Sequence, residues 1–258
     1  MAAAAKVKSI FVYPIKSCRG ISVAHQAPIT TTVVKAPGME VLKVPLMKTT
    51  STTTTSLVVG EWCGSALDEG DAAAQWFSNY LGKPARLLRF NNASEVRTVD
   101  RGYKVMFSDH YPFLLLSQGS LNALNARLKE PVPVNRFRPN ILVDGCEPFS
   151  EDLWTDMRIN DSTFQGVKLC SRGKVPTINQ ETGVAAAASE ITHTLTTFRS
   201  DKALQLRRPN NKHNSTAPGK VYFGLNLVCN SAKGNSIKVG DPVFVLKMVS
   251  SAANAAAA

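Results

Sequence analysis

The sequence lacks the cysteine patterns of secreted disulfide-rich proteins and of zinc-binding domains. Its 258 residues include five cysteines, an odd number, and no two of them form a C-x-x-C pair. They stand at Cys18, Cys63, Cys146, Cys170 and Cys229. Because a disulfide framework needs paired cysteines and a zinc knuckle needs closely spaced ones, this spacing excludes both classes. We therefore expect a reducing compartment.

Long hydrophobic runs are missing as well. The longest, Pro112-Phe-Leu-Leu-Leu116, is far shorter than the roughly 20 apolar residues that cross a bilayer. We expect it to form a buried strand or the start of a helix, and we expect no transmembrane segment. Residues 1–6 contain no apolar core of the kind found in signal peptides. A cytoplasmic location is therefore the default expectation.

Acidic residues are few: 19 Asp and Glu stand against 30 Lys and Arg, a formal net charge of +11. Such a balance is typical either of a nucleic-acid groove or of a pocket for phosphate or another anion. The basic residues are scattered, apart from a group between Lys202 and Lys220 in a polar stretch that we expect to be a solvated loop. No nucleic-acid recognition motif accompanies the charge, so we expect no nucleic-acid partner.

Strand signals dominate what is present. An apolar fraction of 44% predicts a folded chain. Segments rich in β-branched and aromatic residues predict strands at 7–12, 33–34, 39–44, 86–90, 141–143, 157–159, 164–169, 221–228 and 237–246. Because short turns separate these segments, the pattern predicts a β-rich α+β fold with a barrel-like sheet and a few helices.

Three helices are expected among the strands. An apolar stripe at 76–81 predicts the first, which Gly82 ends. The second is predicted to begin with Ser120 as its N-cap and to place leucines as far as Leu128 on one face. A third, short helix is expected at 191–198.

Polar residues concentrate in three loops, at 13–18, 135–140 and 170–173. The loops contribute Lys16, Arg138 and Arg172, which together are able to bind a phosphate or a similar anion. Asn140 offers a donor and an acceptor to a planar heterocycle. Taken singly, each loop also has the composition of an ordinary solvated turn. The three loops together predict an anion-binding site.

The third loop, Cys170-Ser-Arg-Gly173, adds a thiol to this set. A soft thiolate beside a guanidinium and a hydroxyl suits a thiolate-ligated metal that carries an anionic cofactor. Gly173 stands where a second cysteine would complete C-x-x-C. Whether the loop holds a metal therefore depends on that position.

Four motifs follow one another in a recognisable order: Val12-Tyr-Pro-Ile-Lys-Ser-Cys-Arg-Gly20, Asn135-Arg-Phe-Arg-Pro-Asn140 with Asp144-Gly-Cys146, Cys170-Ser-Arg172, and Ile237-Lys-Val-Gly-Asp-Pro-Val243. With these motifs the sequence resembles the MOSC family, named after the C-terminal domain of molybdenum cofactor sulfurase. Within the family it is similar to plant proteins that resemble the mitochondrial amidoxime-reducing component. The motifs are spread over almost the whole chain.

The resemblance implies a MOSC β-barrel-like domain at 83–249 and a truncated N-terminal β-domain at 1–82, whose first strand and loop contribute to the site. The tail at 250–258 is expected to be disordered. A molybdopterin-type molybdenum cofactor is implied as the ligand. The residues that the resemblance assigns to it are Lys16, Ser17, His110, Tyr111, Arg138, Asn140, Ser171 and Arg172. Lys16, Ser17 and Arg138 would contact its anionic end. Asn140 would hold the pterin, and the pair at 171–172 would flank the metal.

The chain departs from the family at two places. In enzymatic members the cysteine directly after the Ser/Pro-Arg pair ligates molybdenum, and here that residue is Gly173. Cys170 is a weak substitute, because residues three apart in a strand point to opposite faces. After Thr32 the family continues through an Asp-Arg-x-Trp segment that this chain lacks, so several N-terminal strands are expected to be missing.

The resemblance implies an oxidoreductase that reduces N-hydroxylated compounds. Separate haem and flavin proteins would supply its electrons. The resemblance also makes association with mitochondria an alternative to a cytoplasmic location. The competing hypothesis is a non-enzymatic cofactor carrier or an inactive paralogue, which Gly173 favours. Sulfur transfer is a third class, but sulfurases of that kind depend on a separate pyridoxal-phosphate domain, for which this chain has no room. Pyridoxal phosphate binding is therefore only a family-level association.

Overall fold

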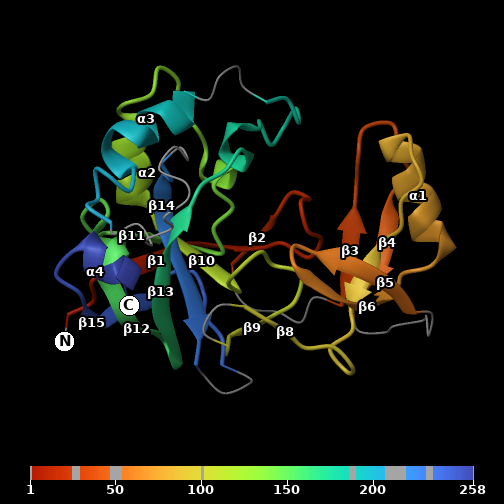
Figure 1. Cartoon of the computed structure of the whole chain (residues 1–258), viewed down its shortest axis with the longest axis horizontal. Coiled ribbons are helices and arrows are strands. Elements are labelled where there is room, and N and C mark those ends of the chain that lie inside the picture. The colour runs from red at the N-terminus through yellow and green to blue at the C-terminus, as the bar shows by residue number, and fades with distance from the viewer. Residues whose placement is uncertain are drawn as a thin grey trace, which may run out of the picture. The chain divides into compact units, whose positions relative to one another are not determined.

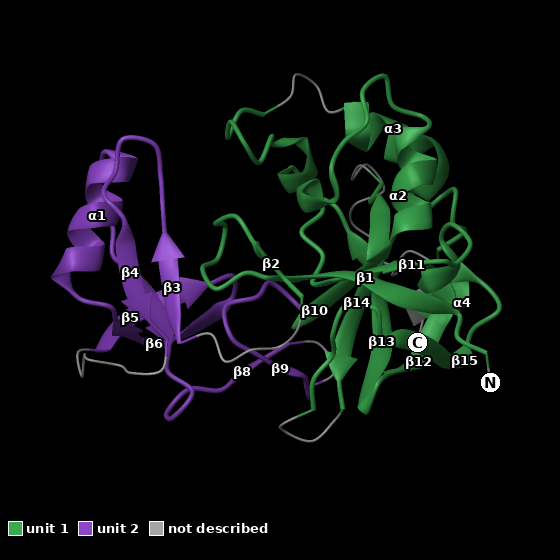
Figure 2. Ribbon diagram, turned by 180° about the vertical axis from the view of Figure 1, so that it is seen from behind, with its two compact units in different colours: residues 1–26, 111–258 green, residues 27–110 purple. Residues whose placement is uncertain are grey.

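The computed structural model describes residues 2–24, 30–46, 54–99, 102–185, 190–206, 219–230 and 235–257 (Figure 1). The chain forms two compact units, one made of residues 1–26 and 111–258 and the other of residues 27–110 (Figure 2). Both are rich in strands, and the described residues include four α-helices. No helix in the described part is long and apolar enough to cross a membrane.

The larger unit is built on a closed β-barrel. Its strands are β1 (Ala5–Val12), β10 (Phe113–Ser117), β11 (Ile141–Asp144), β12 (Trp154–Ile159), β13 (Ser162–Ser171), β14 (Tyr222–Cys229) and β15 (Pro242–Met248). They pair in the order β11-β10-β14-β13-β12-β15-β1, and a further pairing of β1 with β11 closes the ring. Only the pairing of β10 with β11 is parallel within this ring. The β-rich α+β fold with a barrel-like domain is confirmed.

The barrel is closed because β1 pairs with a strand of the ring on each of its edges. Backbone bonds join β1 to β11 along one edge and to β15 along the other, while β2 (Ile21–Val23) adds to β1 outside the ring. Closure leaves no open sheet edge in the ring. The first strand thus belongs to the barrel unit, whereas the sequence suggested a boundary near residue 82; the units divide at 26/27 and 110/111.

Alternating side chains fill the interior of the barrel. Met157 and Ile159 on β12 and Leu115 on β10 have no exposed surface, and they pack with Val143 and Leu227 in one cluster. A second cluster lies under α2 (Gln118–Asn125) and α3 (Glu190–Arg199), the helices that cover one end of the sheet in Figure 1. Because successive side chains of a strand point to opposite faces, one set fills the barrel interior and the other faces away from it.

Two local expectations are corrected by the structure. Helix α2 starts before Ser120, because Ser117 ends β10 in an extended conformation and its hydroxyl accepts the Ser120 amide at 3.0 Å. Leu128 lies beyond the helix end. The tail expected to be disordered forms α4 (Ala252–Ala257), since alanine has the highest helix propensity and Ala255 is buried.

The described residues of the smaller unit form three separate sheets and one α-helix. Its elements are β3 (Thr31–Val34), β4 (Leu42–Pro45), β5 (Thr54–Val59), β6 (Trp62–Asp68), α1 (Asp71–Leu81), β7 (Leu88–Phe90), β8 (Arg97–Thr98) and β9 (Lys104–Val105). Gly82 follows α1 with φ +65°, a left-handed conformation that suits glycine, which confirms the predicted helix end. Most of the expected basic loop between Lys202 and Lys220 lies outside the described residues.

Candidate functional site

Hydrogen bonds bring the three predicted loops together in the barrel unit. The first loop follows β1, the second runs from η2 (Val134–Arg136) to the start of β11, and the third leaves the end of β13. Arg138 Nη1 donates to the Cys18 carbonyl at 2.7 Å, which joins the second loop to the first. Arg172 Nη1 donates to the Phe137 carbonyl at 3.0 Å, which joins the third loop to the second.

Two non-glycine residues of these loops have left-handed backbones. Ser17 has φ +66° and Arg138 has φ +54°. Such conformations are unfavourable for residues with a Cβ by about 1–3 kcal/mol and persist where the surrounding structure holds them. They cluster at functional sites in proteins. Their occurrence in two of the three converging loops marks this region as a candidate site.

Tyr13 contacts Arg138 and the backbone that follows it. Its ring stacks on the Arg138 guanidinium, with 4.2 Å between Cζ and the ring centroid, and its hydroxyl donates to the Pro139 carbonyl at 3.1 Å. Burial raises the pKa of Tyr13 to about 12, and the positive charges of Arg138 and Arg172 oppose this rise. The hydroxyl is therefore a neutral donor at physiological pH.

Arg172 is held by backbone carbonyls. Its Nε donates to the Phe223 carbonyl at 2.8 Å, its Nη2 bonds the same oxygen, and the guanidinium lies over the Phe137 ring. Burial lowers the pKa of the Arg172 guanidinium, while nearby Cys170 and Tyr13 oppose that shift. Because arginine stays charged even so, and no ion pair of Arg172 with a carboxylate occurs among the described residues, its charge suits an anionic ligand.

Asn140 is engaged in joining strands. Its Oδ1 accepts the Leu114 amide at 3.0 Å, and its Nδ2 donates to the Phe11 carbonyl at 3.3 Å. Its own amide bonds the Leu114 carbonyl at 2.8 Å. The two ends of the side-chain amide are thus hydrogen-bonded to β10 and β1. The expected role of Asn140 in holding a heterocycle stays a prediction.

The other expected site residues are placed as follows. Lys16, Ser17 and Ser171 are exposed in the barrel unit, where the loops converge. Tyr111 belongs to the same unit and is 7% exposed, whereas His110 is exposed and belongs to the smaller unit. The structure thus brings the lysine, the serines and the two arginines into one set of connected loops.

Nothing in the described residues forms a metal centre. No group of three or more His, Cys, Asp or Glu side chains in that part of the chain is arranged to hold a metal ion. Cys170 is half-buried near the end of β13, with its Sγ 3.8 Å from the Ser171 carbonyl oxygen. Gly173 follows the strand, and a Cβ added there would meet no atom within 4 Å. Space for a side chain is therefore present at the position where the family's thiolate is expected.

Two features of the site were missed by reading the sequence for charge alone. One is Tyr13, which appeared only as part of a motif. The other is an ion pair of Arg19 Nη1 with Glu181 Oε2 at 2.7 Å, which joins the first loop to the segment after η4 (Val175–Thr177). The spacing of residues along the sequence predicts neither contact, because the partners lie more than 120 residues apart.

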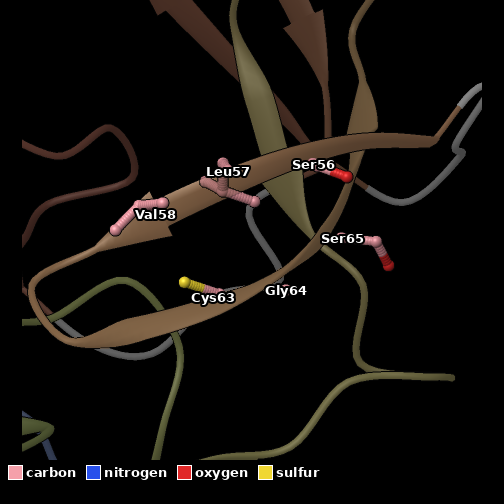
Figure 3. Close-up of a pocket in the computed structure, with 6 residues that line it drawn as sticks. All are labelled: Ser56, Leu57, Val58, Cys63, Gly64 and Ser65. Carbon is pink, nitrogen blue, oxygen red and sulfur yellow. The ribbon is translucent and has the colours of Figure 1, made fainter.

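A shallow hollow in the smaller unit lacks the features of this site. It lies on the β5–β6 hairpin (Figure 3), and the residues that line it are Ser56, Leu57, Val58, Cys63, Gly64 and Ser65. None of these side chains is charged at neutral pH, and one cysteine alone makes no metal site. The loops of the barrel unit remain the candidate site.

Family models match most of the chain. The model described as MOSC domain matches residues 102–244, and the model described as MOSC N-terminal beta barrel domain matches residues 27–84. The second range lies within the smaller unit. The first covers the barrel strands from β10 to β14 and the start of β15, but not β1.

Similar proteins include amidoxime-reducing components. The chain is 29% identical to mitochondrial amidoxime reducing component 2 of Bos taurus and 30% identical to that of Rattus norvegicus, in each case over 92% of this chain and 82% of the relative. The Bos taurus alignment spans 289 residues, more than the 258 of this chain, so the relative contains residues with no counterpart here. The chain is also 27% identical to molybdenum cofactor sulfurase of Oryza sativa subsp. japonica, over 86% of this chain but 32% of the relative.

Proposed function

Because the chain belongs to the MOSC domain family, we propose that it binds a molybdopterin-type molybdenum cofactor at the converging loops of the barrel unit. We further propose an oxidoreductase type of function, the reduction of N-hydroxylated compounds. The amidoxime-reducing relatives, matched over most of their length, support this reaction class. The observation that carries the proposal is that hydrogen bonds of Arg138 and Arg172 join the three loops, which brings two guanidinium groups into one set of connected loops.

The residues present fit the anionic end of such a cofactor. Arg138 and Arg172 supply planar donors that match phosphate oxygens, and Lys16 adds a third positive charge from the exposed first loop. Ser17 and Ser171 contribute hydroxyl groups that orient the ligand by hydrogen bonds. Half-burial of both arginines strengthens their interaction with an anion, since water screens them less there.

The residues present do not supply the metal's thiolate. Gly173 has no side chain, and Cys170, the nearest thiol in sequence, precedes it within β13. This observation favours a second candidate function, a non-enzymatic cofactor carrier that holds the pterin without reducing substrates. When bound with its metal, the cofactor would supply two-electron transfer to an N–O bond. The chain's own residues would bind and orient it.

Partners and location follow from the same proposal. Separate haem and flavin proteins would supply electrons. The net charge of +11 would attract acidic partners to the protein. The mitochondrial names of the relatives suggest mitochondrial association for this chain as well. Sulfur transfer is not proposed, because the chain spans only a third of the sulfurase relative.

The test is to express the full chain in a host that makes the cofactor and to measure bound pterin and molybdenum per protein. Stoichiometric pterin with molybdenum, together with reduction of an amidoxime by a chemical electron donor, is the result expected for the oxidoreductase. Pterin without molybdenum supports the carrier. A protein that holds neither, while the same host loads a known cofactor-dependent enzyme, would overturn cofactor binding altogether.

A further inference from the structure

Two contacts join Tyr13 to the pair Arg138-Pro139, although the residues are about 125 positions apart. The ring lies against the Arg138 guanidinium at 4.2 Å, and the hydroxyl donates to the Pro139 carbonyl at 3.1 Å. Tyr13 therefore contacts both the side chain of Arg138 and the backbone that follows it. A cation over an aromatic face is held by electrostatic attraction, which increases when the pair is shielded from water.

Arg138 needs such support. Its φ of +54° lies in the left-handed region, which side chains with a Cβ rarely adopt. The Asn135 carbonyl accepts the Arg138 amide at 3.2 Å on one side, and Tyr13 fixes the Pro139 carbonyl on the other. The guanidinium itself is held by the Tyr13 ring and by the Cys18 carbonyl, which accepts Nη1 at 2.7 Å, so its direction depends on the backbone conformation and on these two contacts.

The Tyr13 ring is itself fixed by close packing. A Cβ added at Gly20 would lie 2.4 Å from Tyr13 Cε1, so only glycine leaves room for the ring in its present place. Gly20 has no left-handed backbone, and its requirement is therefore steric. Gly20 and Tyr13 bracket the first loop, which also carries Lys16 and Ser17.

We infer that Tyr13 is a positioning residue of the proposed site: it holds Arg138 in the orientation that binds the ligand's phosphate, and Gly20 holds Tyr13. The inference rests on the proposed function. Tyr13 acts through Arg138 rather than on the ligand, because its hydroxyl proton is already donated to Pro139. An aromatic ring, and not the hydroxyl alone, is thus the requirement at position 13.

The experiment measures the dissociation constant of inorganic pyrophosphate by calorimetry at low salt, for the full chain and its variants. Tyr13→Phe keeps the ring and should bind within about threefold of the natural protein. Tyr13→Leu and Gly20→Ala should each weaken binding about tenfold, the range expected for a partly buried cation–π contact. If the hydroxyl alone were required, Tyr13→Phe would lose pyrophosphate affinity as Tyr13→Leu does. Affinity retained in Tyr13→Phe therefore shows that the ring is what matters.

Matched controls separate positioning from a general loss of stability. Arg158 lies over the Phe244 ring at 4.8 Å on another part of the barrel unit, so Phe244→Leu removes a similar stack away from the loops. Gly64→Ala displaces the Trp62 ring in the smaller unit, as Gly20→Ala displaces that of Tyr13. Both controls should bind pyrophosphate like the natural protein.

A double-mutant cycle with Arg138→Met decides whether Tyr13 acts through Arg138. Once Arg138 is replaced, Tyr13→Leu should weaken binding by no more than about twofold further, because effects on one shared interaction are not additive. Fully additive losses, or a Tyr13→Leu protein that binds normally, would overturn the inference while leaving the proposed function standing. If the natural protein binds neither pyrophosphate nor pterin, the proposed function falls and the inference with it.

Discussion

Arg199 Nη2 and Asp152 Oδ2 are 2.5 Å apart, in an ion pair of which neither side chain is more than 4% exposed. Arg199 lies at the end of α3, and Asp152 lies in η3 (Ser150–Leu153). The guanidinium also bonds the Tyr222 carbonyl at 3.0 Å and stacks on Phe149 at 4.6 Å. One buried arginine therefore fastens a helix, a turn and the strand β14 together.

The stability contributed by Asp152 should fall as pH rises. Burial raises the pKa of Asp152 to about 6, since the positive charge of Arg199 only partly offsets burial and the neighbouring Glu151 adds to the rise. A folded-state pKa above the unfolded one means that the contribution is present below about pH 4 and is lost through about pH 6. We expect the natural protein's advantage over Asp152→Asn to shrink by roughly 1–3 kcal/mol across that window.

Urea unfolding at several pH values checks this. The natural protein must be compared with Asp152→Asn at each pH, because the stability contributed by other carboxyl groups changes in the opposite direction. Arg86 lowers the pKa of Asp68, and Lys8 lowers the pKa of Asp144. The stability that these two carboxyl groups contribute is therefore lost as pH falls. An advantage of the natural protein that grows from pH 4 to pH 7 would contradict the prediction.

Replacing Arg199, the other partner of the buried ion pair, should lower the free energy of unfolding strongly. Arg199→Met leaves the Asp152 carboxylate buried without its partner, which typically costs about 3–5 kcal/mol. Changing both residues to apolar ones should recover part of this loss, since no charge is then stranded. The free energy of unfolding measures both. As the exposed counterpart, Arg19→Met breaks the pair with Glu181 and should cost less than about 1 kcal/mol.

Gly173→Cys should fold as well as the natural protein. A Cβ at this position meets no atom within 4 Å, and the backbone of Gly173 is not left-handed. We expect a thermal midpoint within about 2 °C of the natural one and an increase in molybdenum per bound pterin. Gly173→Ser is the matched control, because it has a similar size without a thiolate. Equal molybdenum in the Cys, Ser and natural proteins would show that position 173 does not decide metal retention.

Arg172→Lys should lower both stability and anion binding. The guanidinium bonds two carbonyls, those of Phe137 and Phe223, in a fork that a single ammonium cannot reproduce. Loss of one hydrogen bond to a charged group predicts a decrease of about 1.5–3 kcal/mol in the free energy of unfolding. Pyrophosphate affinity should drop as well. Arg158→Lys, at an exposed position, serves as the control, and unfolding curves of equal midpoint for the two variants would refute the assigned role.

The high pKa of Tyr13 predicts a late tyrosine titration. Its folded-state pKa is above the unfolded value of 10, so its contribution to stability is present below pH 10 and is lost as pH rises through about 12. Ultraviolet absorbance of tyrosinate in the natural protein should therefore contain a component near pH 12 that is missing from Tyr13→Phe. Identical titration curves of the two proteins would contradict the burial of Tyr13.

Residue patterns alone predicted most strands and the helices α1 and α3, because their apolar residues recur with the period of the element. The end of α1 at Gly82 was predicted for the same local reason. The sequence did not predict the start of α2, since the choice between Ser117 and Ser120 as N-cap depends on where β10 ends in the barrel. The helical tail was missed because the burial of Ala255 is a tertiary contact.

The sequence by itself determined the family, the barrel-like class and the three loops that carry Lys16, Arg138 and Arg172, since these depend on local composition and motif order. Only the tertiary structure decided that β1 completes the barrel, that the Asn140 amide joins strands, and that Tyr13 lies under Arg138. Such relationships join residues more than 25 positions apart, and no local pattern encodes them. They arise when closure of the sheet brings the ends of distant strands to the same place.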